Sequence, residues 1–194
     1  MNKPFEQSNA LQVIPRSGEY SYSERQGSPS FEIGMGQFVV EKGNLITRGA
    51  STCIVIAAHN KISKKGMLTH LSSLTSTDAS ASEQRDVLEQ ALSAVTSWGD
   101  GEHTKIQVLG GSHLREGGKL LSSSKRNRDY VQNRLSQFRL VLPVENIRVD
   151  WLDDDRSIDV ELNTKLGTLA VYESEAFKIP EETDPFARLA HLLK

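Results

Sequence analysis

The stretch Leu45–Ile56, which reads LITRGASTCIVI, contains the only cysteine among the 194 residues of the chain. Its second half continues as an apolar run to Ala58, the pattern of a strand buried on both faces. Cys53 is therefore expected near the start of a central strand. The next apolar segment, Met67–Leu71, contains His70, and the polar residues between the two segments predict a hairpin that brings Cys53 and His70 to the same end.

A cysteine, a histidine on the adjacent strand and a nearby hydroxyl are the nucleophile, base and orienting group of thiol-based acyl transfer. A neutral imidazole near the thiol would take its proton and raise the thiolate fraction. The small and hydroxylic residues Gly49–Thr52 would let a substrate approach the sulfur and could place backbone N–H groups around it. The residues alone leave another interpretation open, because a lone cysteine in an apolar strand is most often a small buried hydrophobe.

The composition is that of a globular protein that folds in water, with 37% apolar and 25% charged residues and a formal net charge of −2. We expect no nucleic-acid partner, because there is no strongly basic balance. A single cysteine excludes an internal disulfide and favours a cytoplasmic location. We expect no membrane insertion. The alternative to a cytoplasmic location is export, and the sequence shows no obvious Sec signal for it.

The chain is expected to be one domain, residues 31–194, preceded by a flexible tail, residues 1–30, or by a partner-binding arm of the same extent. Helical spacing predicts a helix after a capping box at Ser80 and Glu83, and Ser72–Ser82 before it is expected to be a mobile loop. A second helix is predicted after Ser122, and a short third one over Asp184–Leu193. The predicted strands, besides those of the hairpin, are Gln37–Val40 and Lys105–Leu109, followed by three closing strands, Asn146–Leu152, Ser157–Leu162 and Thr168–Tyr172. This order predicts an α+β layered fold with a mixed β-sheet.

No motif predicts a metal or organic cofactor. The run Asp153–Asp155 lacks the alternating spacing of a calcium loop and is expected to be a solvated turn. Gly110-Gly111 and Gly117-Gly118 lack the Lys-Ser/Thr that follows in a phosphate-binding loop. The basic residues of the second helix are expected to form its solvent-exposed face; they are Lys125, Arg126, Arg128 and Arg134, with Lys119 nearby.

Residues around Cys53 resemble the chemoreceptor glutamine deamidases of the CheD type. Members of that family have a Thr-x-Gly-x-Gly-Ser-Cys-like segment and a histidine seventeen residues after the cysteine, in a Gly-Met-x-His-like strand. Thr47, Gly49 and Cys53 keep that register, and His70 lies seventeen residues on, after Gly66-Met67. The resemblance covers about residues 32–172 and continues in Ile33–Gly36, Lys105–Gly111, Arg126-Asn127, and Ser157–Val160 with Gly167–Leu169.

The resemblance implies a layered α/β/β/α-like sandwich and a protein-glutamine deamidase that works through a thioester. It implies that Cys53 is the nucleophile, His70 the general base and later acid, and Thr47 the group that orients His70. The substrate and oxyanion region would include Ser51, Thr52 and Ser157. The partner would be a protein that presents a glutamine side chain to a monomeric enzyme, with a regulatory protein partner left open.

Two alternatives accompany this expectation. The architecture is similar to that of the secreted glutamine-deamidating toxins of the cytotoxic necrotizing type, so the chain could be an effector that acts on a host or competitor protein. The other alternative is a non-catalytic binding module of the same fold, which docks through Ser51-Thr52 and the basic helix.

Overall fold

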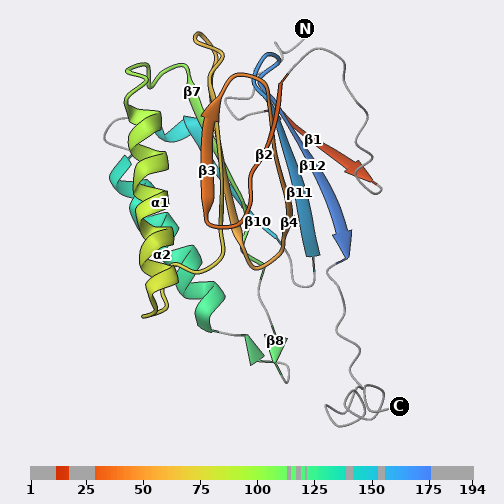
Figure 1. Cartoon of the computed structure of the whole chain (residues 1–194), viewed down its shortest axis with the longest axis vertical. Coiled ribbons are helices and arrows are strands. Elements are labelled where there is room, and N and C mark those ends of the chain that lie inside the picture. Colours follow the sequence, from red (N-terminus) through yellow and green to blue (C-terminus); the bar gives the residue numbers. More distant parts are fainter. Residues whose placement is uncertain are drawn as a thin grey trace, which may run out of the picture.

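A computed structural model of the chain describes residues 12–17, 29–112, 115–116, 119–120, 122–138, 142–152 and 156–175. These residues form two mixed five-stranded sheets, one two-stranded hairpin and two helices, so the expected α+β class is confirmed. The two large sheets lie face to face, and both helices lie beside one of them (Figure 1).

The first sheet has the strand order β1-β12-β11-β4-β2. Its centre is antiparallel, because β11 pairs with both β12 and β4 in opposite directions, whereas the outer strands β1 and β2 join in parallel. The bounds are β1 (Gln12–Ser17), β2 (Ser30–Glu32), β4 (Asn44–Ala50), β11 (Arg156–Asn163) and β12 (Thr168–Glu175).

The second sheet has the strand order β10-β7-β5-β6-β3 and is antiparallel except for the pair of β10 and β7. The bounds are β3 (Gln37–Glu41), β5 (Ile54–Asn60), β6 (Gly66–Leu71), β7 (Thr104–Gly110) and β10 (Ile147–Trp151). The remaining elements are α1 (Ala79–Thr96), α2 (Ser122–Phe138), the 3-10 turn η1 (Val144–Asn146), and the short pair β8 (Arg115–Glu116) and β9 (Lys119–Leu120).

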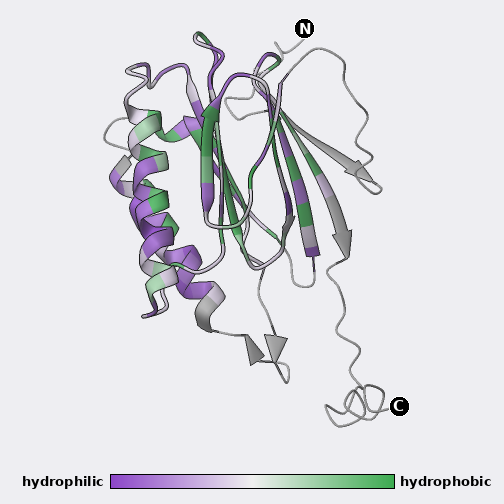
Figure 2. Cartoon of the chain, in the orientation of Figure 1, coloured by the Kyte–Doolittle hydropathy of each residue, from purple (hydrophilic) through white to green (hydrophobic). Residues whose placement is uncertain are grey.

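Strand β5 is buried along its whole length and separates two apolar cores. Ile54, Ile56 and Ala58 belong to the core between the second sheet and the helices. Val55 and Ala57, on the alternate face, belong to the core between the two sheets. Helix α1 contributes its buried side to the first of these cores, and its hydrophilic residues face outward (Figure 2).

The layers are therefore sheet, sheet, helices. Among the described residues no helix covers the outer face of the first sheet, so the second helical layer of the expected α/β/β/α-like sandwich is not seen there. The expected third helix, Asp184–Leu193, and the acidic turn Asp153–Asp155 lie outside the described residues.

The hairpin expected from the two apolar segments is confirmed, since β5 and β6 pair directly. The expected strands and the first two helices are also present, but β10 joins the second sheet rather than the closing strands β11 and β12. The segment expected to be a tail, residues 1–30, contains β1, which pairs with β12, and the start of β2.

The N-cap of α1 differs from the expected capping box at Ser80 and Glu83. The cap is Asp78, whose carboxylate accepts a hydrogen bond of 2.8 Å from the Ala81 N–H. Ser80 lies within the first turn of the helix. Aspartate and serine both suit the N-cap position, so the sequence pattern alone does not select between Asp78 and Ser80.

Substitution of Leu88 by alanine tests the role of the helix-facing core. Leu88 of α1 is fully buried, so Leu88→Ala is expected to lower the free energy of unfolding by about 2–5 kcal/mol through lost burial and a residual cavity. Urea denaturation followed by circular dichroism measures the change. The matched control is Gln90→Ala on the exposed side of the same helix, for which a change within about 0.5 kcal/mol is expected.

Candidate active site

Cys53 and His70 come to the same end of the β5–β6 hairpin. Val55 lies directly opposite His70, and Cys53 precedes Val55 by two residues, so Cys53 occupies the diagonal position relative to His70. In a regular antiparallel pair such neighbours have Cα atoms roughly 7–8 Å apart. Cys53 packs against the core between the sheets, which is also the side to which His70 turns.

Thr47 joins the two sheets by a buried hydrogen bond. It lies on β4 of the first sheet, and its Oγ1 is 2.8 Å from Nδ1 of His70 on the second sheet. The same hydroxyl donates a hydrogen bond of 2.8 Å to the carbonyl oxygen of Ile33. A hydroxyl has one proton, and the Ile33 carbonyl can only accept, so Thr47 accepts from Nδ1–H of His70. The network therefore places a proton on Nδ1, so that in the neutral imidazole Nε2 is the unprotonated nitrogen.

This tautomer leaves a lone pair on Nε2 of His70. That atom is buried, in a residue that is only 5% exposed, and it has no hydrogen-bond partner among the described residues. Burial also lowers the pKa of His70, which favours the neutral ring. An unpaired basic nitrogen in a buried position is costly for stability, and it is the group that a general base requires.

Cys53 is half-buried, and burial raises the pKa of its thiol. Hydrogen bonds from the Thr52 side chain and from the backbone of Cys53 and Ser51 act in the opposite direction. Because a thiolate can only accept, the backbone groups that favour it are N–H groups. The backbone N–H groups that act on the sulfur are therefore those of Ser51 and Cys53, of which Ser51 alone lies in the Gly49–Thr52 stretch expected to provide them. Burial favours a neutral thiol and a neutral imidazole together, rather than an ion pair.

The bend Ser51–Cys53 is held against the end of β7. The N–H of Gly111 donates to the carbonyl of Cys53 at 2.6 Å, and the N–H of Ser112 donates to the carbonyl of Ser51 at 2.9 Å. The hydroxyls of Ser51 and Ser112 are 3.1 Å apart and hydrogen-bonded. At Gly110 a Cβ atom would lie 2.3 Å from the Cys53 carbonyl oxygen, and φ is +92°, so no other residue fits there without a shift.

Arg128 of α2 in turn holds the Gly110–Ser112 segment. Its Nε donates to the carbonyl of Gly111 at 2.5 Å, a second guanidinium N–H donates to the carbonyl of Leu152 at 3.0 Å, and the guanidinium carbon lies 5.1 Å from the centre of the Trp151 ring. The expectation that Arg128 belongs to a solvent-exposed basic face is therefore wrong. Arg134 is also paired, with Glu89 of α1, whereas Lys125 and Arg126 are exposed.

The segment after His70 is docked on both helices instead of being the expected mobile loop. The side-chain oxygen of Gln84 accepts from the N–H of Ser72 at 2.6 Å and of Ser73 at 3.3 Å. The side-chain oxygen of Asn127 accepts from the N–H of Leu74 at 3.1 Å. Gln84, Asn127, Ser112 and Arg128 are the positioning residues that were not identified as such from the sequence, although Asn127 lies in the Arg126-Asn127 segment of the family resemblance.

Ser157 is not brought to the Cys53 and His70 side of the first sheet. It precedes Ile158, which points into the core between the sheets, so strand alternation turns Ser157 to the other face. The neighbouring pairing contains a bulge, in which Arg48 and Gly49 oppose Asp159. Gly49 has a φ of +66°, and its N–H donates to the Asp159 carboxylate at 2.8 Å.

Two other kinds of site have no support among the described residues. In that part of the chain no three His, Cys, Asp or Glu side chains gather as a metal site would require. Within the same residues no helix has the length and apolar composition needed to cross a bilayer. Comparison of the chain with protein-family models gave no match, and comparison with curated proteins gave none either.

The lowered pKa of His70 predicts a pH dependence of stability. Between the unfolded pKa of about 6.5 and the lower folded value, the unfolded chain binds more protons, so stability is complete above this window and decreases as pH falls through it. His70→Asn is expected to reduce the loss of unfolding free energy between about pH 7.5 and pH 5.5. Some loss remains, because burial also lowers the pKa of His59. The control is His103→Asn, at an exposed position. An undiminished loss in His70→Asn would contradict this account.

Arg128→Lys tests whether the guanidinium holds the segment behind Cys53. Lysine cannot reproduce the two donors or the ring contact, so the unfolding free energy is expected to fall by about 1.5–3 kcal/mol. Hydrogen exchange of the Gly111 and Ser112 amides, which bond to the Ser51–Cys53 bend, is expected to become faster. Arg126→Lys, at an exposed neighbour, is the control. Unchanged exchange at both amides would show that Arg128 does not hold this segment.

Proposed function

We propose that the protein is a cysteine-dependent protein-glutamine deamidase. The observation that carries the proposal is the buried Nε2 of His70, which has no partner among the described residues and which is the unprotonated nitrogen of the neutral ring when Nδ1 donates to Thr47. The one cysteine of the chain lies at the same end of the hairpin, diagonal to His70 in the strand register. The resemblance to the CheD-type deamidases, which rests on the register of Thr47, Cys53 and His70, supplies the substrate class.

In the proposed reaction Nε2 of His70 takes the proton of the Cys53 thiol as the sulfur attacks the carboxamide carbon of a glutamine. Because burial keeps both groups neutral at rest, proton transfer accompanies the attack. The resulting imidazolium gives its proton to the leaving nitrogen, and ammonia departs from the thioester. His70 then removes a proton from water, which hydrolyses the thioester to glutamate and returns the thiol.

Thr47 has the orienting role in this proposal. Its oxygen accepts the Nδ1 proton and its own proton is committed to the Ile33 carbonyl, so the ring is held in one tautomer and one orientation. The bend at Ser51–Cys53 supplies backbone N–H groups beside the sulfur. A donor aimed at the developing oxyanion stabilises an acyl-transfer transition state by roughly 3–4 kcal/mol in a hydrolase of known mechanism.

The substrate is then a protein that presents a glutamine side chain, and the enzyme needs no metal or organic cofactor. A chemoreceptor substrate in the cytoplasm follows from the family resemblance, with an effector acting on a host or competitor protein as the alternative. Deamidation of purified chemoreceptor domains at a useful rate would count against the effector alternative.

The activity is tested by ammonia release together with a mass increase of about 1 Da in candidate substrate proteins, the change from a carboxamide to a carboxylate. Wild type is expected to be active, and Cys53→Ser and His70→Asn are expected to lose activity by at least about a hundredfold, the contribution of a positioned acid or base. Arg126→Lys serves as the control for handling and folding. Activity that survives both substitutions would rule out the proposal.

The pKa of Cys53, raised by burial, is the observation that favours the non-catalytic binding module. Alkylation by iodoacetamide separates the two functions. If His70 is the base for Cys53, His70→Asn slows alkylation at neutral pH relative to wild type, because no imidazole takes the thiol proton as the sulfur attacks the reagent. A rate that is slow in both proteins and independent of His70 would favour the binding module.

A further inference from the structure

A lysine-rich surface lies at the end of the sandwich opposite Cys53 and His70. Six of the seven lysines whose side chains the structure describes belong to it, the seventh being Lys125 on α2. We call this surface the lysine end and define it by Lys42, Lys61, Lys64, Lys65, Lys105 and Lys165, together with the apolar residues Ile62 and Leu166.

Three turns from different parts of the sequence meet there. The β5–β6 turn and the β11–β12 turn are joined by a hydrogen bond of 2.8 Å between Nε2 of His59 and the carbonyl of Thr164. The β3–β4 turn joins them, since the N–H of Gly43 donates to Oγ1 of Thr164 at 2.7 Å, and the N–H of Thr164 donates to the Gly43 carbonyl at 3.0 Å. These turns project from the upper end of the molecule in Figure 1.

The positive charges of this surface lie close together. Burial, and after it the charge of Lys61, lowers the pKa of Lys105; burial, and after it the charges of Lys64 and Lys105, lowers the pKa of His59. The three ammonium groups therefore act on the same small region. Lys42, Lys61, Lys64, Lys65 and Lys165 are exposed. Within the described part of the chain none of these five forms an ion pair. Such a concentration of one charge is attractive to an anionic surface.

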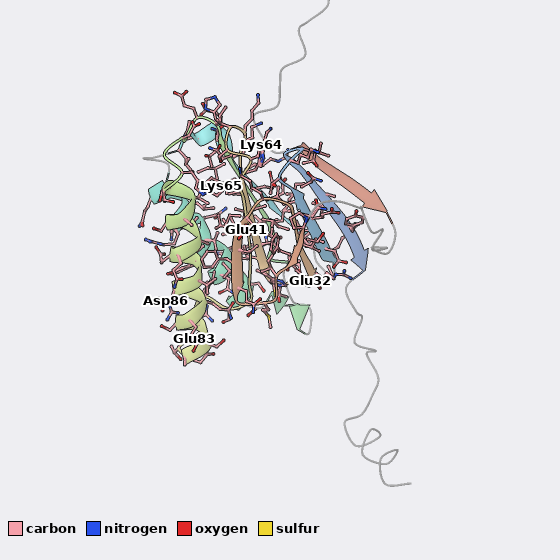
Figure 3. All side chains as sticks on the ribbon, turned by 45° about the horizontal axis from the view of Figure 1, so that its top comes forward. Glu32, Glu41, Lys64, Lys65, Glu83 and Asp86 are labelled. Atoms are coloured by element: carbon pink, nitrogen blue, oxygen red, sulfur yellow. The ribbon has the colours of Figure 1, made fainter. Side chains whose placement is uncertain are left out.

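Charges elsewhere on the molecule determine how it would be oriented on an anionic surface. The chain as a whole has a formal net charge of −2, so the lysine end is a local feature. Lys64 and Lys65 lie at one end of the view in Figure 3, and the carboxylates of Glu83 and Asp86 lie at the far end of α1. Asp100, Glu102 and Glu145 flank the lysine end along the β7 and β10 side, and Asp100 is paired with His103. An anionic surface would therefore attract the three turns and repel the first turns of α1, where Glu83 and Asp86 lie.

Two large aliphatic side chains project among these lysines. Ile62 follows Lys61 at the tip of one turn, and Leu166 follows Lys165 at the tip of another; each is 65% exposed. The three turns contain no arginine and no aromatic residue, which are the side chains that bind nucleic-acid phosphates bidentately and stack on bases. Aliphatic tips flanked by lysines fit instead the boundary between lipid headgroups and acyl chains.

We propose that the lysine end docks the protein peripherally on an anionic lipid bilayer, with Ile62 and Leu166 entering the headgroup region and the lysines binding acidic headgroups. The interaction is independent of the thiol chemistry. With β5 standing upright on the bilayer, it would hold the Cys53 end away by about the rise of that strand, roughly 20 Å for six residue steps. A protein substrate would then be met at that height above the membrane.

The test is co-sedimentation of the full chain with vesicles of phosphatidylcholine alone and with vesicles that contain roughly one third phosphatidylserine. Binding is expected to the anionic vesicles and not to the neutral ones, and to be lost in about 0.5 M NaCl, where charges are strongly screened. Cys53→Ser is expected to bind as wild type does, so failure of the proposed deamidase activity leaves this result unaffected.

Two matched pairs of variants assign the surface. Lys64→Gln with Lys165→Gln is expected to weaken binding by roughly tenfold or more, whereas Lys125→Gln with Arg126→Gln removes the same charge from α2 without this effect. Ile62→Ser with Leu166→Ser is expected to weaken binding, whereas Met35→Ser, at another exposed apolar position, is not.

Three results would overturn the proposal. The first is equal or undetectable binding to neutral and anionic vesicles. The second is anionic binding that the lysine-end variants do not change. The third is lysine-dependent binding of a DNA or RNA duplex without binding of anionic vesicles, which would make the lysine end a nucleic-acid surface.

Discussion

The burial of both faces of β5 is the constraint on which the rest of the structure depends. An apolar strand with no solvent-facing side needs a cover on each face, and here α1 and α2 cover one face while the first sheet covers the other. The two cores then fix the register of β6 and β7 on either side of β5. A shift of one residue would exchange the two sets of apolar side chains, so the position of Cys53 at the start of the strand is set by packing rather than by local interactions.

The polar contact of Thr47 with His70 lies inside this otherwise apolar packing. The energetic cost of burying these polar groups is reduced because both of their protons have acceptors. Nδ1–H of His70 donates to Thr47, and the Thr47 hydroxyl donates to the Ile33 carbonyl. Nε2 of His70 is the exception among these groups. An unpaired buried nitrogen lowers stability. Asn44 Oδ1 and Gln107 Oε1 are also buried without a partner among the described residues, but Nε2 is the basic atom of the three, and its basicity is the physical reason for the proposed chemistry.

Support for the cysteine comes from a chain of contacts that crosses the molecule. Trp151 and Arg128 hold Gly111, the Gly110–Ser112 segment holds the Ser51–Cys53 bend, and the same helix α2 provides Asn127 to the segment that follows His70. The two helices thus fix both sides of the site from behind the second sheet. Their contribution is positional, since neither helix places a side chain beside the sulfur among the contacts described above.

The sequence by itself determined the elements whose signal is local. The two-faced apolar run predicted β5, the polar turn after it predicted the hairpin, and the helical spacing predicted α1, so these local patterns already place Cys53 and His70 at one end of the hairpin. Only the tertiary structure decided which sheet each closing strand joins, that Asp78 caps α1, that Arg128 is tied to Gly111, and which nitrogen of His70 bears the proton. The reason is physical: strand partners, buried hydrogen bonds and tautomers depend on groups distant in sequence, and no local pattern of residues specifies them.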